Sequence, residues 1–546
     1  AITFSTLPVD NTGTITNAGH GTGNVTISGG VGSNVTAIAE ASTNSALIID
    51  TTAITVNSGG TTLANTSPGN AKLTVSTYVN GIGDLILKNN SAIADGITLM
   101  TRSITNAGRV INSGSGSGNT LISAIIGANV TGVIQDSGTS PLILSGVNTY
   151  SSGTTISNGV LRVANATGSG TGTGAVNVNS GGILQGTGTI SGPVTNSYGG
   201  TISPGTDGTA GGTLTMGNLT WNGGGVFHCE VASIATEGVG VGVDYDTIEV
   251  SGSLTAVTNG TNLVIRMDSL GQTLAFDTNR NYALRVIACG TAATLNPADV
   301  TLDTNLFLLN ASGTWSVTNA NKSIWVIYRS NALTNNNYWI GSGASTNWST
   351  SANWSKGRAP VPGENVEFDW NSTANCAANI VSNNLGSITL AAGYTGTVTF
   401  VTNAVEGGMN LAVGEITIRA GNLAFRGDTT AQGGGTPTDK WGVGYTVTAT
   451  NVSIFAGGSI NANDTGFSAS DGPGKAPSKF VAASHGGFGG NLGRGYAPAP
   501  RYGTPAGPTA LGSCGINGSG SAGAPGGGAL KLVLSGTATV NGVLST

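Results

Sequence analysis

Residues 142–163 constrain the fold of this chain more than any other stretch. It holds two short apolar runs and a third, alternating one, and the dipeptides Ser145-Gly146 and Asn158-Gly159 interrupt the pattern. Alternation with a period of two between such dipeptides is typical of strands and turns, because successive side chains of a strand face opposite sides. No helical period occurs here. We therefore expect short β-strands joined by tight turns.

Composition argues against both a disordered chain and a packed α/β globule. Gly accounts for 90 of the 546 residues and only 8% are charged, against about 7% Gly and about 25% charged residues in an average protein. Disorder usually combines low hydrophobicity with high net charge, whereas this chain is 38% hydrophobic with a net charge of −5. Its apolar residues occur in short runs. This distribution suits a solenoid, in which each rung contacts only its neighbours.

The stretch 142–163 also resembles the autotransporter-associated β-strand repeat, which occurs in passenger regions and other large secreted proteins of Gram-negative bacteria. The resemblance is best over residues 120–205 and looser over the rest of the first 330. In that family the repeat forms rungs of a parallel β-helix outside the cell. The resemblance implies a surface protein, and it does not imply an enzyme.

Internal repetition supports a solenoid. The heptad Ile-Thr-Val-Asn-Ser-Gly-Gly at residues 54–60 recurs as Val-Asn-Val-Asn-Ser-Gly-Gly at 176–182, and in weaker form at 452–458. Each copy is an alternating strand that ends at a Gly pair. We expect the chain to turn a corner there, because Gly adopts the positive φ that such a corner requires.

These features predict an all-β protein with a right-handed parallel β-helix. The predicted divisions are a repetitive β-helix over 1–220, a β-rich cap or sandwich-like elaboration over 221–334, a Trp-rich junction over 335–370, and a second Gly-rich, solenoid-like β-domain over 371–546. The cut near 335 follows from the tryptophans: none precedes Trp221, whereas Trp339, Trp348, Trp354 and Trp370 share one segment. That segment resembles one that joins β-domains in the same large secreted proteins.

Residues 464–528 differ in kind, because they form a long Gly-, Ala-, Pro- and Ser-rich insertion with few strand-forming residues. Loops of this length are either functional or disordered. Two interpretations of this insertion remain open: it packs against another chain, or it is an ornamental surface loop.

The sequence offers little for catalysis. His20, His228 and His485 lie far apart without metal-ligand spacing, and no nucleophile elbow or phosphate loop stands out. Paired carboxylates can hydrolyse sugars, but we expect a structural role for the richest polar cluster, His228, Cys229, Glu230, Asp244, Asp246 and Glu249. We expect no cofactor; calcium at Asp464 and Asp471 is the alternative considered, although their spacing matches no calcium loop.

The four cysteines fit an oxidising exterior. Cys229 and Cys289 lie before the predicted cut near 335, and Cys376 and Cys514 lie after it. Pairing within each domain is the simplest of the three connectivities. We therefore hypothesise the disulfides Cys229–Cys289 and Cys376–Cys514.

Localisation and partners follow from charge and hydropathy. The 20 Lys and Arg residues are scattered and outnumbered by 25 acids, so we expect no nucleic-acid partner. No apolar run approaches the ~20 residues of a membrane span. The sequence begins at Ala1 without Met, as a secreted protein does after signal-peptide cleavage, and we expect an extracellular or cell-surface location.

Three functional classes remain. We favour a structural subunit of an extracellular filament or surface layer that supports attachment in a biofilm. The first alternative is a monomeric adhesin, in which the segment of Trp339, Trp348 and Trp354 or the Gly-rich insertion contacts carbohydrate or a host surface. A polysaccharide-degrading enzyme is the least favoured, because no catalytic constellation is evident.

Head-to-tail self-association is the assembly we expect. Unpaired strand edges recruit other strands unless they are capped, and a heterologous contact between the two ends propagates into an open filament. The rival explanation is that the sequence is a fragment whose next rungs are missing. The residues assigned to the subunit interface are Ala1, Ile2, Thr3, Phe4, Ser5, Thr6, Leu7, Val540, Val543 and Leu544.

Overall fold

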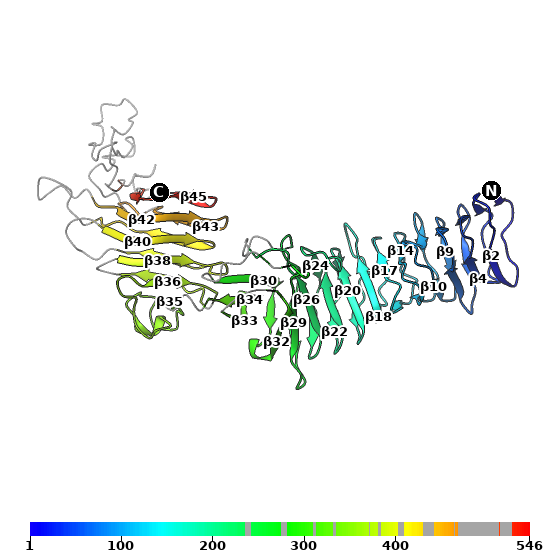
Figure 1. Cartoon of the computed structure of the whole chain (residues 1–546), viewed down its shortest axis with the longest axis horizontal. Coiled ribbons are helices and arrows are strands. Elements are labelled where there is room, and N and C mark those ends of the chain that lie inside the picture. Colours follow the sequence, from blue (N-terminus) through cyan, green and yellow to red (C-terminus); the bar gives the residue numbers. More distant parts are fainter. Residues whose placement is uncertain are drawn as a thin grey trace, which may run out of the picture. The chain divides into compact units, whose positions relative to one another are not determined.

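The computed structural model shows a chain of β-strands arranged in two compact units (Figure 1), residues 1–332 and 333–546. It describes residues 1–234, 242–272, 274, 281–308, 313–330, 335–370, 372–379, 384–401, 409–429, 442–463, 465–467, 511, 513 and 527–545. Those residues form strands and two short 3₁₀ segments, η1 (Pro297–Asp299) and η2 (Ser351–Asn353), and they contain no α-helix. The division between the units lies close to the predicted cut at 335.

The first unit is a parallel coil with three faces, each built from strands that recur once per rung. One face comprises β1 (Ile2–Phe4), β3 (Val25–Ile27), β5 (Leu47–Ile49), β8 (Leu73–Val75), β11 (Ile97–Leu99), β14 (Thr120–Ile122), β17 (Leu142–Leu144), the second half of β18 (Thr154–Val163), β20 (Gly182–Gly186), β23 (Thr201–Pro204), β26 (Val226–Glu230), β29 (Leu263–Asp268) and β32 (Val300–Leu306).

The second face comprises β2 (Gly13–Asn17), β4 (Val35–Glu40), β7 (Thr61–Asn65), β10 (Leu85–Asn89), β13 (Val110–Asn112), β16 (Val133–Asp136), the first half of β18, β19 (Val176–Val178), β22 (Val194–Asn196), β25 (Leu219–Asn222), β28 (Ser253–Val257) and β31 (Ala292–Thr294). The third face is β6 (Ile54–Val56), β9 (Val79–Gly81), β12 (Ser103–Ile104) and β15 (Ile125–Ile126) in early rungs, and β21 (Thr189–Ile190), β24 (Thr213–Met216), β27 (Thr247–Val250) and β30 (Tyr282–Cys289) in later ones.

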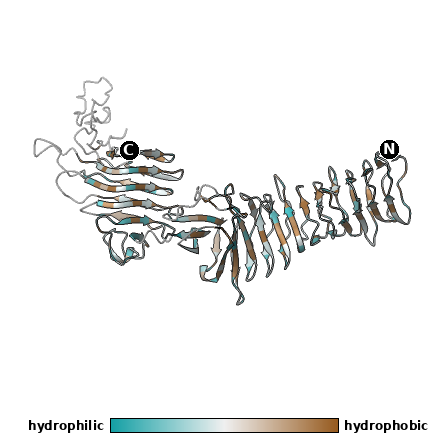
Figure 2. Cartoon of the chain, viewed as in Figure 1, coloured by the Kyte–Doolittle hydropathy of each residue, from teal (hydrophilic) through white to brown (hydrophobic). Residues whose placement is uncertain are grey.

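In-register ladders of aliphatic side chains fill the coil. Leu47 pairs with Leu73, and Leu73 with Ile97, so that the three side chains stack in the interior, where each is fully buried. The alternate residues, such as Ile48 and Thr74, are only partly buried. Figure 2 shows the resulting bands of hydrophobic residues along the strands. The predicted parallel β-helix is thereby confirmed.

Buried amide side chains also stack, at the ends of strands of the second face. The amides of Asn17, Asn65 and Asn89 and the carboxyl group of Glu40 occupy equivalent positions in successive rungs, and all four are buried. The Asn65 amide nitrogen donates to the backbone oxygens of Ala71 (3.0 Å) and Gly96 (2.6 Å). These side chains therefore form hydrogen bonds with backbone groups of the turns that the strand ladders leave unpaired.

The repeated Gly pairs adopt the expected corner. Gly60, Gly181 and Gly457 have φ values of 103°, 82° and 94°, the left-handed region that favours glycine. In each copy the seventh residue of the heptad donates its backbone N–H to the fourth; Gly182 N, for example, donates to the oxygen of Asn179 at 2.8 Å. The predicted turn is confirmed at all three positions.

The β-helix of the first unit extends beyond the predicted boundary at residue 220. Strands β25 and β26 pair in parallel with β28 and β29, and these pair with β31 and β32. The rungs continue although the local sequence is less repetitive, because pairing depends on register rather than on sequence identity. An antiparallel hairpin, β33 (Thr314–Ala320) and β34 (Ser323–Arg329), then joins β30. Residues 221–330 thus contain the last rungs and the hairpin.

The second unit is a parallel coil with two principal sheets. One contains β35 (Asn336–Trp339), β36 (Asn365–Phe368), β38 (Asn384–Leu390), β40 (Met409–Ile418), β42 (Tyr445–Ile454) and β44 (Leu530–Leu534), with β45 (Ala538–Val540) also on β42. The other contains β37 (Cys376–Ala378), β39 (Thr397–Phe400), β41 (Gly421–Phe425), β43 (Gly458–Asn461) and β46 (Val543–Ser545). The predicted junction 335–370 is therefore part of this solenoid, since β35 and β36 are its first strands.

Candidate functional site

The first rung of the first unit is open on its outer side. Strand β1 pairs with β3 through Ile2, Thr3 and Phe4, and among the described residues no strand pairs with its other edge. Ile2 and Phe4 are 59% and 48% exposed. A cavity of about 500 Å³ opens beside them, lined chiefly by small and apolar residues that include Val9, Ile15 and Val25. Backbone hydrogen-bonding groups and apolar surface are exposed together at this end.

The last rung of the second unit has the same character. Strand β46 pairs with β43 on one side only within the described part of the chain. Val540, Val543 and Leu544 are exposed, Val543 by 56%. The predicted interface residues therefore lie on two outermost rungs, with apolar side chains accessible. Whether those rungs meet in an assembly stays a prediction.

The tryptophans predicted to contact a ligand are core residues instead. Trp339, Trp348 and Trp354 are buried to 1% exposure or less. Their rings pack edge to face, Trp348 on Trp354 at 4.7 Å and Trp339 on Trp354 at 5.1 Å between centroids. The ligand-contact prediction is wrong because the segment folds over the first rung and turns these rings into the coil.

The predicted disulfides are not present either. Cys229, Cys289 and Cys376 carry free thiols, and Cys514 lies outside the described residues. Cys229 is in β26 on one face of the coil, whereas Cys289 ends β30 on another. Burial raises the pKa of the Cys229 and Cys376 thiols well above the ordinary value. Buried thiols of high pKa are poor nucleophiles, and these behave as core residues.

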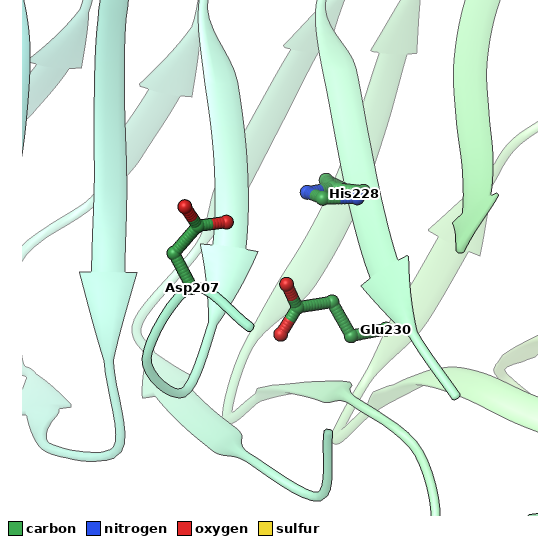
Figure 3. Close-up of side chains that lie close together, drawn as sticks. All are labelled: Asp207, His228 and Glu230. Carbon is green, nitrogen blue, oxygen red and sulfur yellow. The ribbon is translucent and has the colours of Figure 1, made fainter. Parts of the chain in front are cut away.

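The predicted polar cluster divides into two groups. Glu249 lies on β27 and pairs with Arg285 at 3.2 Å. His228 and Glu230 lie on β26, and they are joined by Asp207, a residue that sequence reasoning missed. The ligand atoms of Asp207, His228 and Glu230 lie within 4.8 Å of one another (Figure 3). The Pro-Gly-Thr-Asp-Gly turn at 204–208 was the signal that could have indicated Asp207.

Backbone donors hold the buried carboxylates of this region. Glu230 accepts hydrogen bonds from the backbone N–H groups of Gly208 (2.8 Å) and Thr209 (3.0 Å). Asp246 accepts from those of Gly212 (2.8 Å) and Glu230 (3.2 Å). Burial raises the pKa of Asp246 to about 7 and also raises that of Glu230. Because both carboxylates are almost inaccessible, their contacts support structural roles over sugar hydrolysis.

The other predicted site residues are placed as follows. His20 is exposed near the first rung, and His485 and the candidate calcium ligands Asp464 and Asp471 lie outside the described residues. Most of the Gly-rich insertion 464–528 lies outside them as well. No helix in the described parts is long and apolar enough to span a membrane.

No family model matches the chain, and no curated protein matches it. The resemblance to the autotransporter-associated repeat therefore remains a prediction.

Proposed function

We propose that this protein is a structural subunit of an extracellular bacterial filament or surface layer, and that its copies join head to tail. In this proposal the last rung of one copy docks on the first rung of the next and adds strands to β1. The adjoining apolar cavity would be covered at the same time. The resulting material would support cell–cell or surface attachment in a biofilm.

The observation that carries the proposal is that both outermost rungs have an unpaired strand edge and exposed apolar side chains. Strand addition supplies main-chain hydrogen bonds, and the exposed Ile2, Phe4, Val543 and Leu544 supply apolar contact. A contact between two different surfaces propagates without closing. By contrast, burial of the tryptophans removes one of the two features considered for an adhesin; the other, the Gly-rich insertion 464–528, lies mostly outside the described residues.

Two complementary variants test this assembly. Phe4→Asp places a charge on the first rung, and Val543→Asp places one on the last rung; both positions are exposed, so each variant should fold. By negative-stain microscopy the original 546-residue chain should form fibres, and neither variant should. An equimolar mixture should form dimers and stop, because one intact end of each kind remains.

The matched control is Ile82→Asp, at a position that is 71% exposed and outside both outermost rungs. This variant should form fibres like the original chain. Single, dispersed copies of the original chain at high concentration would contradict the proposal and favour the adhesin. Fibres from the Phe4→Asp variant would contradict the assigned interface.

A further inference from the structure

Three potential metal ligands converge where β26 meets the preceding turn. His228 and Glu230 belong to β26, and Asp207 belongs to the turn that follows β23. Figure 3 shows the Asp207 and Glu230 carboxylates and the His228 ring around one small space. Glu230 is 1% exposed, His228 is partly buried and Asp207 is exposed. The arrangement is thus anchored on the protein side and accessible from solvent.

Contacts outside the trio hold two of the three groups in place. The hydrogen bonds from Gly208 and Thr209 to the Glu230 carboxylate bring the turn that carries Asp207 against β26. On the other side of the imidazole, His228 Nε2 lies 3.2 Å from Oδ2 of Asp268, which leaves Nδ1 for the shared space. A carboxylate behind a histidine is the usual outer partner of a metal-binding imidazole, because it fixes the tautomer and the ring orientation.

The neighbouring cationic side chain does not neutralise the carboxylates of the trio. Arg266 lies beside His228 in the parallel register, but its guanidinium pairs with Asp303 at 3.0 Å. The carboxylates of Asp207 and Glu230 lie at the same small space as the His228 imidazole (Figure 3). A bound dication would offset the repulsion between these two carboxylates.

We infer that Asp207, His228 and Glu230 bind one divalent transition-metal ion of the zinc class. The set of one imidazole nitrogen and two carboxylates suits such an ion better than calcium, which takes six to eight oxygen ligands. The ion ties the 205–209 turn to β26 and so links two successive rungs. This inference goes beyond the proposed assembly and does not depend on it.

Titration calorimetry with zinc sulfate on the chelator-treated full chain tests the site. We expect one ion bound per chain with an effect on stability, seen as a higher melting temperature at saturating zinc. Asp207→Asn should weaken binding at least 10-fold. Because Asp207 is exposed and its backbone is unchanged, this variant should keep the native circular dichroism. His228→Gln should reduce binding further.

The matched control is His20→Gln, which removes an exposed histidine far from the trio in sequence and should leave zinc binding unchanged. Unchanged zinc binding by both Asp207→Asn and His228→Gln would overturn the inference. Calcium chloride binding as tightly as zinc would also overturn it, since the imidazole would then contribute nothing.

Discussion

The first rungs of the two units differ in how their apolar interior meets the outside. In the first unit, β1 leaves Ile2 and Phe4 about half exposed beside an open cavity. In the second, residues 340–364 fold over the beginning of the coil, and a cluster of aromatic rings fills it. Trp354 is 1% exposed and packs on Trp339, Trp348 and Phe368.

This difference shows two solutions to one physical problem. A parallel coil has an apolar interior and unpaired strand edges at each end. Unless the interior and the edges are covered, they can associate with other chains. The second unit covers its beginning with aromatic rings, each of which buries a large apolar area. The described residues contain no such cover for the first unit. The proposed docking contact is placed at this open rung.

The largest expected effect is at the aromatic cluster. Trp354→Ala removes a fully buried ring and its hydrogen bond to the Trp348 oxygen (2.6 Å), and should destabilise the second unit by about 4 kcal/mol. Phe4→Ala at the open rung should cost less than about 1 kcal/mol. Hydrogen exchange in the full chain measures the two losses of stability: peptides from 384–429 report on the second unit, and peptides from 13–49 report on the first. Equal losses would erase the distinction between a closed and an open beginning.

A second test concerns the charged residues that order the covering segment. Glu364 is buried and pairs with Lys356 (2.6 Å) and Arg358 (2.9 Å). Burial raises its pKa, but the hydrogen bonds from Arg358 and Lys356 outweigh burial and lower it to about 2, from an ordinary value of 4.5. Its contribution is therefore present above about pH 4.5 and is lost as the pH falls toward 2.

Glu364→Gln should accordingly destabilise the second unit by about 3 kcal/mol at pH 7 and flatten its stability profile between pH 5 and pH 2. Urea unfolding across this range provides the measurement. Glu415→Gln, at an exposed position of β40, is the matched control and should change stability by less than about 0.5 kcal/mol. A mutant profile as steep as that of the original chain would refute the role of Glu364.

The stability of the first unit should depend on its buried amide side chains. Asn65→Ala removes two hydrogen bonds to backbone oxygens and one from Ser67 N (2.8 Å). Leaving these buried groups unpaired should cost about 2 kcal/mol. Asn44→Ala, at an exposed position of the same coil, should be nearly neutral. Equal urea midpoints for the two variants would show that the amide stack is dispensable.

The smallest expected effect is that of salt. Most ion pairs among the described residues are partly exposed, such as Arg109–Asp84 and Arg285–Glu249, and exposed pairs contribute little. Raising sodium chloride from 0.05 M to 0.5 M should change the free energy of unfolding by less than about 1 kcal/mol. Urea titrations at the two concentrations would expose a larger electrostatic contribution as a displaced midpoint.

Much of the local structure could be predicted from the sequence. Alternation and Gly pairs predicted strands and corners, and both are found where the heptads at 54–60 and 176–182 place them. These features are local, because side-chain direction in a strand and positive φ at a corner depend on neighbouring residues. The end of the rungs was not predictable in this way. Strands β25 to β32 continue the coil by parallel pairing in register, although the sequence repeat is no longer recognisable there.

The site required the tertiary structure, because its members come together through stacking of rungs. Cys229 and Cys289 share a domain, yet the coil places them on different faces. The same stacking brings Asp207 to His228 and Glu230 across successive rungs, which no spacing in the sequence predicts. It also decides exposure: Trp354 and Phe4 are both aromatic residues at a first rung, but Trp354 is 1% exposed and Phe4 is 48% exposed. The sequence by itself determined the strands, the corners and the all-β class, whereas packing between rungs determined which side chains meet and which remain accessible.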